Sequence, residues 1–314
     1  MLKTSAHSFE NPLVSVVMPV FNGEQFLPEV LDSILAQSFS DFELLIADNA
    51  STDATAAICQ KYAAIDSRII YHRQAENLGV FANAEWLYSR AKCEFLMQIG
   101  DDDVYEPNCL ALYVERIRDR KDVILVYSDY GWIDVDGRRS DSGLRHFMAN
   151  TNDIYQNLSM YIRAPIVLPM GMGLFRTRVV QEAMPFPTLG KHYQDFTGSR
   201  DIIYLWKLLP KGRIDSVQLP LFYYRKKDRS DTVPTSWGRN RIIIKLRVIH
   251  LNWIVLAKHA IPAIFSAELT LLQKIRLSIF AAIMFFAHYS LIPVAQNFLR
   301  YFKTKRAQRL SVGG

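Results

Sequence analysis

Carboxylate and amide side chains follow three short apolar runs in the first third of this 314-residue chain. In sequence order they are Asn22, Asp48, Asn49, Asp101, Asp102 and Asp103. If the runs are parallel strands of one open sheet, their carboxyl ends lie along one crevice, which is where such sheets bind ligands. The three loops are therefore predicted to face a common ligand.

The run of three adjacent acids, 101–103, indicates metal chemistry. Neighbouring carboxylates repel one another unless a cation or several hydrogen-bond donors compensate their charge. A hard divalent ion such as Mg²⁺ or Mn²⁺, bound by one or two carboxylates and by substrate phosphates, is an ordinary solution. The alternative is a solvated acidic turn or helix cap before Pro107, which the apolar run 95–99 directly upstream makes less favoured.

The surrounding pattern predicts the elements that would position these loops. Apolar runs at 13–18, 43–47, 68–71, 94–99 and 123–128 alternate with helical spacing at 24–37, 51–62, 81–91 and 107–119. Such alternation is typical of βαβ units around a mainly parallel sheet. After residue 129 the pattern loosens, with helices expected near 153–162 and 201–209 and strands at 213–217 and 221–225. Ser51 is expected to cap the second helix.

Charge is distributed unevenly along the chain. From Arg239 to the end there are twelve Lys or Arg and one acid, Glu268, whereas residues 1–238 hold 25 Lys or Arg and 30 Asp or Glu. Blocks of Phe, Ile and Leu separate the basic residues of the tail, and nucleic-acid binding does not explain such blocks. An anionic membrane surface accommodates both the charge and the apolar blocks, so it is the expected partner of the tail.

The tail is predicted to be helical at 241–265 and 269–302, after a linker at 230–240 that contains Pro234 and Gly238. Between Arg276 and Arg300 twenty-three residues carry no Asp, Glu, Lys or Arg, a length that could span a bilayer. Because Pro293 and several polar residues interrupt this stretch, helices that lie in the membrane interface are favoured over a clean span.

Cysteine usage and the N-terminus bear on the location. The three cysteines, Cys59, Cys93 and Cys109, are irregularly spaced and are expected to be reduced, buried thiols. Residues 1–12 form a polar tail without a signal-peptide pattern. We therefore expect the protein at the cytoplasmic face of the inner or plasma membrane.

Four motifs, taken together in this order and spacing, resemble glycosyltransferase family 2. They are VVMPVFN at 16–22, IADNASTD at 46–53, NLG at 77–79, and GDDD at 100–103 with Pro107 following. The resemblance covers about 13–228. It implies a GT-A fold at 13–229, a Rossmann-like and mainly parallel mixed sheet flanked by helices, with 241–314 as a membrane-associating helical region. It also implies a nucleotide-diphospho-sugar donor whose diphosphate is bridged by Mg²⁺ or Mn²⁺.

The same resemblance implies roles for the nucleotide-binding residues. Pro19, Phe21 and Asn22 would form the wall around base and ribose, and Asn77 would belong to the same nucleotide site. Asp48 would accept a hydrogen bond from the base. A carboxylate suits the ring N–H of uracil or thymine, which favours a UDP or dTDP sugar.

For the acidic triplet the resemblance implies a DXD-like motif. Counted back from Pro107, the metal-binding position falls on Asp102, with Asp103 as a further ligand and Asp101 near the ribose or in a second coordination role. Gly100 stands where the family usually has the first Asp, so the division of labour among the three acids stays open.

An inverting transfer needs a base that removes the proton of the acceptor hydroxyl. The resemblance assigns this role to Asp201, with Asp195 as a competing candidate and a purely structural helix-dipole role as the alternative for Asp201. The Tyr-Arg pair that follows in the family matches Tyr224 and Arg225. Arg225 is expected either to bind the diphosphate or an acceptor phosphate, or to belong to a solvated basic loop.

The sequence thus predicts a metal-dependent inverting glycosyltransferase of polysaccharide biosynthesis in the cell envelope. It would transfer a sugar to a lipid-linked or cell-surface glycan acceptor. A polyprenyl-phosphate monosaccharide synthase is the alternative within this class. A nucleotidyltransferase, a non-catalytic nucleotide-binding module and a membrane scaffold are alternatives from other classes. Nucleic acid is not an expected partner, and a homo-oligomer is left open.

Overall fold

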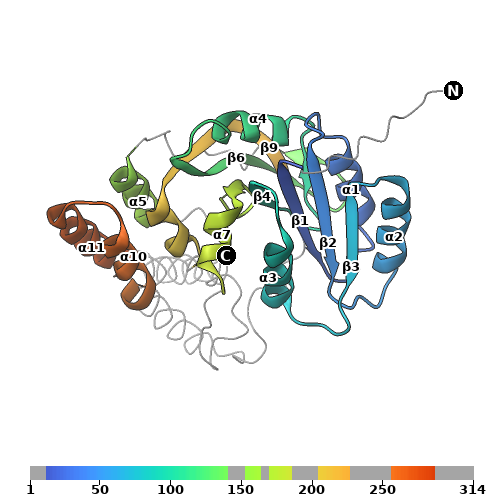
Figure 1. Ribbon diagram of the computed structural model, residues 1–314, viewed down its shortest axis with the longest axis horizontal. Coiled ribbons are helices and arrows are strands. Elements are labelled where there is room, and N and C mark those ends of the chain that lie inside the picture. Colours follow the sequence, from blue (N-terminus) through green and yellow to red (C-terminus); the bar gives the residue numbers. More distant parts are fainter. Residues whose placement is uncertain (1–11, 141–152, 164–169, 186–203, 227–255, 287–314) are drawn as a thin grey trace, which may run out of the picture.

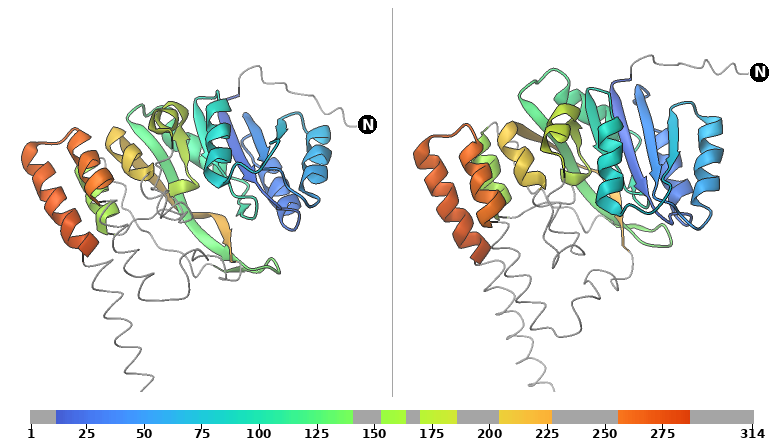
Figure 2. Two further views of the ribbon diagram at one scale, coloured as in Figure 1. Left: turned by 90° about the horizontal axis from the view of Figure 1, so that it is seen from below. Right: turned by 60° about the horizontal axis from the view of Figure 1, so that its bottom comes forward.

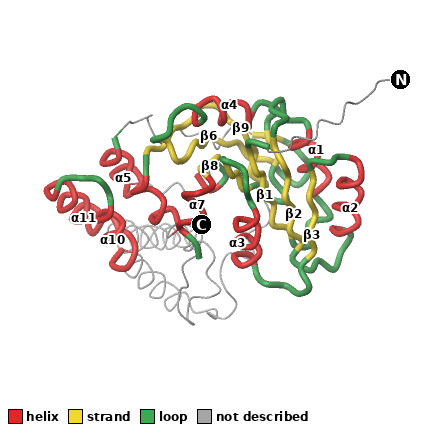
Figure 3. Tube along the Cα trace, in the orientation of Figure 1, coloured by secondary structure: helices red, strands yellow, loops and turns green. Residues whose placement is uncertain are grey.

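The computed structural model describes residues 12–140, 153–163, 170–185, 204–226 and 256–286. Within these ranges the chain forms one mixed sheet of nine strands with helices on both faces (Figures 1 and 3). The strands are β1 (Val14–Val20), β2 (Phe42–Asp48), β3 (Ile69–Arg73), β4 (Phe95–Gln98), β5 (Val104–Tyr105), β6 (Val123–Ile133), β7 (Arg139–Ser140), β8 (Leu174–Arg176) and β9 (Arg213–Arg225). The sheet is the α/β architecture expected from the alternating pattern.

The strand order places the ends of β1, β2 and β4 next to one another. It is β3-β2-β1-β4-β8-β6-β9-β5, with β7 paired to β6. β3, β2, β1 and β4 are parallel, and the antiparallel β8 connects β4 to β6. The carboxyl ends of the parallel strands therefore share one edge of the sheet, as the sequence predicted.

The helices of the described ranges cover both faces of the sheet (Figure 2). They are α1 (Leu27–Leu35), α2 (Thr55–Ile65), α3 (Val80–Arg90), α4 (Cys109–Ile117), α5 (Ile154–Arg163), α7 (Thr177–Ala183), the turns η2 (Leu209–Lys211) and η5 (Leu256–Ala260), α10 (Ile261–Ser266) and α11 (Leu271–Phe286). α1 shows why such segments are helical. Pro28 occupies its first turn, where no amide donor is needed, and its apolar residues recur at helical spacing and are buried.

Alternate residues of β1 serve two apolar cores. Val14, Val16 and Met18 pack with α1 and α4 on one face. Val17 packs on the other face, in the core that includes α3, α5 and α7. Because successive side chains of a strand point to opposite faces, a strand buried on both sides reads as a continuous apolar run.

The second half of the sheet differs from the sequence prediction. β6 continues to Ile133, beyond residue 129 where the pattern loosens, and β9 is one strand where two separate runs were expected. The strand β8 and the helix α7 were not predicted. Parallel pairing of β6 with β9 explains the extension, since Gly131 leaves room for the Tyr223 ring, 2.6 Å from where a Cβ would stand. Pairing between distant segments leaves no local pattern.

The described part of the C-terminal region, residues 256–286, packs against α5, η2 and the apolar core that includes α3 and α7. Leu256, Ile264, Leu277 and Ala281 are at most 2% exposed and belong to the same core as α3 and α7. None of the helices in the described ranges combines the length and the apolar character needed to cross a bilayer. The predicted linker at 230–240 lies outside the described residues.

The three cysteines are buried and free, which confirms the expectation of buried thiols. Burial raises the pKa of the Cys59 and Cys93 thiols to about 12, and it raises that of Cys109 further. These thiols therefore stay protonated and pack as small apolar side chains.

Candidate functional site

The loops that follow β1 and β2 are joined by hydrogen bonds. The backbone N–H of Asn22 donates to Ser51 Oγ (2.9 Å), and Asn22 Oδ1 accepts the N–H of Thr52 (2.9 Å). The N–H of Gly23 donates to Thr55 Oγ1 (2.9 Å). Ser51 is therefore a bridge between loops and not the expected cap of α2, which begins at Thr55 without a side-chain cap.

Two residues of these loops have left-handed backbone conformations, Asn22 with φ 53° and Ala50 with φ 60°. Asn tolerates this region, whereas the Cβ of Ala crowds the following carbonyl oxygen. The strain at Ala50 is maintained by its neighbours, because Asp48 Oδ1 accepts the N–H of Ser51 at 2.8 Å.

Asp48 is fully buried at the end of β2. Its second carboxylate oxygen accepts the hydroxyl of Tyr71 (2.9 Å) and lies 3.6 Å from the Arg73 guanidinium. Burial, and then the bond to Asp48, raise the pKa of Tyr71, so it remains a phenol donor. Asp48 thus holds the loop after β2 through the N–H of Ser51. For its carboxylate to contact a nucleotide base directly, Tyr71 or Arg73 would have to move.

Asn77 holds the loop before α3. Its Oδ1 accepts both the side-chain amide of Asn49 and the N–H of Gly79, each at 2.8 Å. Asn49 Oδ1 in turn accepts the N–H of Leu78 at 2.8 Å. The NLG motif is thus attached to the loop after β2, while Asn77 itself is exposed.

A pocket of about 280 Å³ lies where the loop after β1 meets the acidic loop between β4 and β5. Its lining residues are Asn22, Gly23, Gln25, Phe26, Asp101, Asp102 and Val135. Of the residues singled out from sequence, it therefore brings together Asn22, Asp101 and Asp102. Pro19 lies within β1 and Phe21, 45% exposed, directly after it, and neither lines this pocket.

The three acids of the loop are not equivalent. Asp101 and Asp102 are half-buried and line the pocket, whereas Asp103 is 1% exposed and its Oδ1 accepts the N–H of Arg225 at 3.0 Å. Gly100 is required by close packing, since a Cβ there would lie 2.8 Å from Asp103 Oδ2 and 3.1 Å from Asp102 Oδ1. A side chain at the first position of the motif would displace the acids themselves.

Arg225 lies beneath the acidic loop and is 2% exposed, so it does not belong to a solvated basic loop. Its guanidinium donates to the carbonyl of Asp102 (2.7 Å), to the carbonyl of Asp134 (2.8 Å) and to Glu29 Oε2 (2.5 Å). It also stacks over the Phe26 ring, 4.2 Å from the centroid. Arg225 thus connects the end of β9 to α1, the acidic loop and the β6–β7 turn.

No group of three or more His, Cys, Asp or Glu side chains in the described ranges is arranged as a complete metal site. The donor set of the pocket nevertheless fits a divalent ion that takes its other ligands from a substrate. Two carboxylates, those of Asp101 and Asp102, and the amide of Asn22 supply oxygen ligands of the type that Mg²⁺ and Mn²⁺ prefer. Asp103 is buried and does not line this pocket, and its role as a further metal ligand stays a prediction.

Several residues of this site were not singled out from sequence. Gly23, Gln25, Phe26 and Val135 line the pocket, and Glu29 pairs with Arg225. Gly23, next to Asn22, could have been noticed as a turn residue. Val135 and Glu29 reach the site through the long β6 strand and through α1, and no local pattern marks them. The predicted base Asp201 and its competitor Asp195 lie outside the described residues.

Comparison with known proteins gives a family match. The family model described as "Glycosyl transferase family 2" matches residues 15–179. TuaG of Bacillus subtilis, a putative teichuronic acid biosynthesis glycosyltransferase, is 30% identical over 130 residues, which cover 41% of this chain and 51% of TuaG. The chain spans between 19% and 42% of the length of three further curated relatives that it matches.

Two solved structures share the fold. The crystal structure of S. aureus TarS 1–349 in complex with UDP-GlcNAc has a TM-score of 0.62 at 18% identity, and the match covers 87% of this chain and 72% of the TarS 1–349 chain. The mannosyltransferase PcManGT from Pyrobaculum calidifontis, in complex with GDP-Man and Mn²⁺, has a TM-score of 0.51 at 15% identity, covering 98% and 89%.

The strain at Ala50 predicts that Ala50→Gly stabilises the protein. The left-handed conformation costs an L-residue about 1–2 kcal/mol, which glycine avoids. Glycine in turn destabilises the folded state by about 0.5–1 kcal/mol, because the unfolded chain is more flexible. We expect a net gain of roughly 0.5–1 kcal/mol in the free energy of unfolding, measured by chemical denaturation. The control is Ala57→Gly in the exposed face of α2, expected to lose about 1 kcal/mol. If Ala50→Gly lowered the free energy of unfolding as much as Ala57→Gly does, the backbone of Ala50 would not be strained.

The contacts of Arg225 predict that Arg225→Lys is not tolerated as a conservative change. An ammonium cannot reach the carbonyls of Asp102 and Asp134 and Glu29 together. We expect a loss of roughly 3 kcal/mol in thermal or chemical unfolding, since hydrogen bonds of charged groups contribute about 1.5–3 kcal/mol each. Arg138→Lys, at an exposed ion pair with Asp136, is expected to change stability by less than about 0.5 kcal/mol.

Proposed function

From the membership of this chain in glycosyl transferase family 2, we propose that it transfers a sugar from a UDP sugar to a lipid-linked or cell-surface glycan acceptor, with inversion and with help from a divalent metal. The protein is a glycosyltransferase of the GT-A fold. The donor, the metal and the acceptor are the proposed part, together with a place at the cytoplasmic face of a membrane.

One observation carries the proposal: Asn22, Asp101 and Asp102 line one pocket at the carboxyl edge of the parallel strands. Carboxylates gathered here repel an anionic diphosphate unless a cation lies between them. A Mg²⁺ or Mn²⁺ ion bound by Asp101 and Asp102 would neutralise the charge of the leaving diphosphate. Asp103 has a framework role in this proposal, through its bond to Arg225.

The uridine preference is supported by likeness, and by Asp48 only through the role that the family resemblance gives it. TarS shares the fold of this chain and binds UDP-GlcNAc, whereas PcManGT binds GDP-Man. Asp48 lies behind the loop of Asn22 and orients it through Ser51. We assign Asp48 to the nucleotide side of the pocket, where Tyr71 and Arg73 separate it from solvent.

The chemistry of the acceptor side rests on Asp201. An inverting transfer needs a base on the acceptor hydroxyl, opposite the departing diphosphate. Asp201 precedes the helical segment at 204–208, which is buried in the core next to α7. A cell-surface glycan as acceptor is supported by TuaG, a relative named for teichuronic acid biosynthesis, and a lipid-linked one by the basic, apolar C-terminal region.

The proposal predicts different losses for two substitutions. In Asp102→Asn, thermal stabilisation by UDP-GlcNAc with Mn²⁺ should fall to the level seen with EDTA.

In Asp201→Asn, donor binding should persist while release of UDP with a lipid-linked glycan acceptor falls by about 100-fold or more, the typical contribution of a general base. Unchanged transfer by Asp201→Asn would remove Asp201 from the mechanism. Pyrophosphate release from a nucleoside triphosphate would instead identify a nucleotidyltransferase.

The close packing of the pocket predicts that Gly23→Ala weakens donor binding. A Cβ at residue 23 would lie 3.0 Å from Asp101 Oδ2 and 2.9 Å from Val20 Cγ2, so Asp101 must move. We expect the KM for the UDP sugar to rise about tenfold, which corresponds to about 1.4 kcal/mol. Gly171→Ala is the matched control, because a Cβ there meets nothing within 4 Å. A normal KM in Gly23→Ala would place the donor elsewhere.

A further inference from the structure

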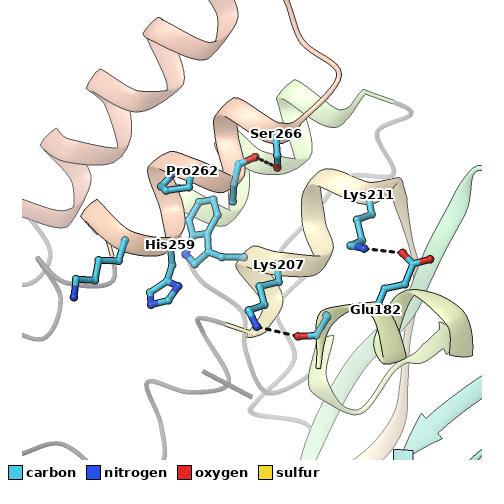
Figure 4. A pocket seen from close by; sticks show the side chains of 10 residues that line it. Glu182, Lys207, Lys211, His259, Pro262 and Ser266 are labelled. Carbon is cyan, nitrogen blue, oxygen red and sulfur yellow. Dashed lines mark hydrogen bonds and ion pairs between the residues drawn. The ribbon is translucent and has the colours of Figure 1, made fainter. Parts of the chain in front are cut away.

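A second pocket, of about 410 Å³, lies between two parts of the chain (Figure 4). One part is α7 with the segment 204–211, and the other is the pair of C-terminal helices η5 and α10. Four basic side chains line it: Lys207, Lys211, Lys258 and His259. In Figure 4, His259 extends from η5, and Lys207 extends from the segment 204–211 toward the end of α7. None of these residues belongs to the pocket of the acidic loop.

The acids near this pocket do not balance its charge. Glu182 is the one acid that lines it, and its carboxylate already pairs with Lys211 (2.8 Å) and with Arg178 (2.7 Å). Lys207 donates to the carbonyls of Ala183 (3.0 Å) and Pro185 (2.9 Å), which uses two of the three donors of its ammonium group. The remaining acid that acts on Lys207 is Glu85 of α3.

Lys258 and His259 are the least compensated groups. They are consecutive in η5, a π-helical turn, and no carboxylate of the described ranges pairs with Lys258. Burial lowers the pKa of His259, and the charges of Lys207 and Lys258 lower it further. Lys207, Lys211 and Lys258 thus bring positive charge together at the pocket.

The floor of the pocket adds a donor without a partner. Trp206 lines the pocket, is 1% exposed, and its Nε1–H finds no hydrogen-bond acceptor among the described residues. A buried N–H that stays unsatisfied costs free energy, and a bound ion or water commonly explains one. The ammonium and imidazole donors of the lining, together with excess positive charge, are the chemistry that recognises phosphate oxygens.

We infer that this pocket binds the phosphate of an anionic lipid headgroup. The helical hairpin that contributes Lys258 and His259 favours a lipid over a soluble phosphate. Its helix α11 carries a row of exposed apolar side chains at helical spacing, 43–67% exposed, and Phe265 of α10 is 46% exposed. The row consists of Leu271, Leu272, Ile275, Ile279 and Ile283. The row does not line the pocket, but it belongs to the same helical hairpin as Lys258 and His259, and a hairpin with both features suits the boundary between headgroups and acyl chains.

The inference does not rest on the proposed function, and its test uses neither donor nor acceptor. The full chain is sedimented with phosphatidylcholine vesicles that contain phosphatidic acid or lack it. Lys258→Glu is expected to weaken binding to the anionic vesicles about tenfold, or about 1.4 kcal/mol. Lys61→Glu, the same change on an exposed lysine of α2, should alter it by less than about twofold because solvent-exposed charges are screened. Thermal melting checks that both variants fold.

A second measurement locates the phosphate. Inorganic phosphate should raise the pKa of His259, followed by NMR, in the native chain but not in Lys258→Glu. Equal weakening by Lys258→Glu and Lys61→Glu would overturn the pocket in favour of general surface charge. A rise in the His259 pKa without vesicle binding would retain the phosphate site and overturn the lipid as its source. No rise and no vesicle binding would overturn both.

Discussion

The buried guanidinium of Arg225 is the interaction on which the arrangement of the acidic pocket depends. A cation removed from water requires partners in defined positions, and removing one of them leaves an uncompensated charge. Arg225 finds them in the acidic loop, in the turn after β6 and in Glu29 of α1. These segments are distant in the sequence, so one side chain decides how the loop of Asp101 and Asp102 faces the loop of Asn22. Arg225 therefore holds the loops of the pocket together, although its own side chain does not line the pocket.

Hydrogen bonds between loops complete this arrangement and divide the polar residues into two groups. Asp48, Ser51, Asn49 and Asn77 satisfy backbone donors of neighbouring loops and thereby shape the edge of the sheet. Asp101 and Asp102 keep their side chains toward the pocket. Burial accounts for Asp48, Asn49 and Ser51, which are at most 3% exposed, because a polar group inside the protein must be paired within it. Asn77 is exposed, and Asp101 and Asp102 are half-buried at the pocket.

The C-terminal helices η5, α10 and α11 pack against this body through a continuous apolar core. The surfaces on either side of that core differ. The cationic pocket lies between α7 and the helices η5 and α10, whereas the exposed apolar row lies on α11. Among the described residues of the tail, Lys258 and His259 line the pocket, whereas the exposed apolar row lies on α11.

The sequence by itself determined the parallel first half of the sheet, the buried thiols and the family, because strands buried on both faces and loops at their carboxyl ends leave short, local patterns. It also pointed to Asn22, Asp101 and Asp102. Only the tertiary structure decided that Arg225 is buried and that Asp103, also buried, accepts the backbone N–H of Arg225. The same holds for β6 and β9, which form one long pair. These features depend on contacts between residues far apart in the chain, such as Arg225 and Glu29, and the burial that makes such contacts strong exists only once the chain has folded.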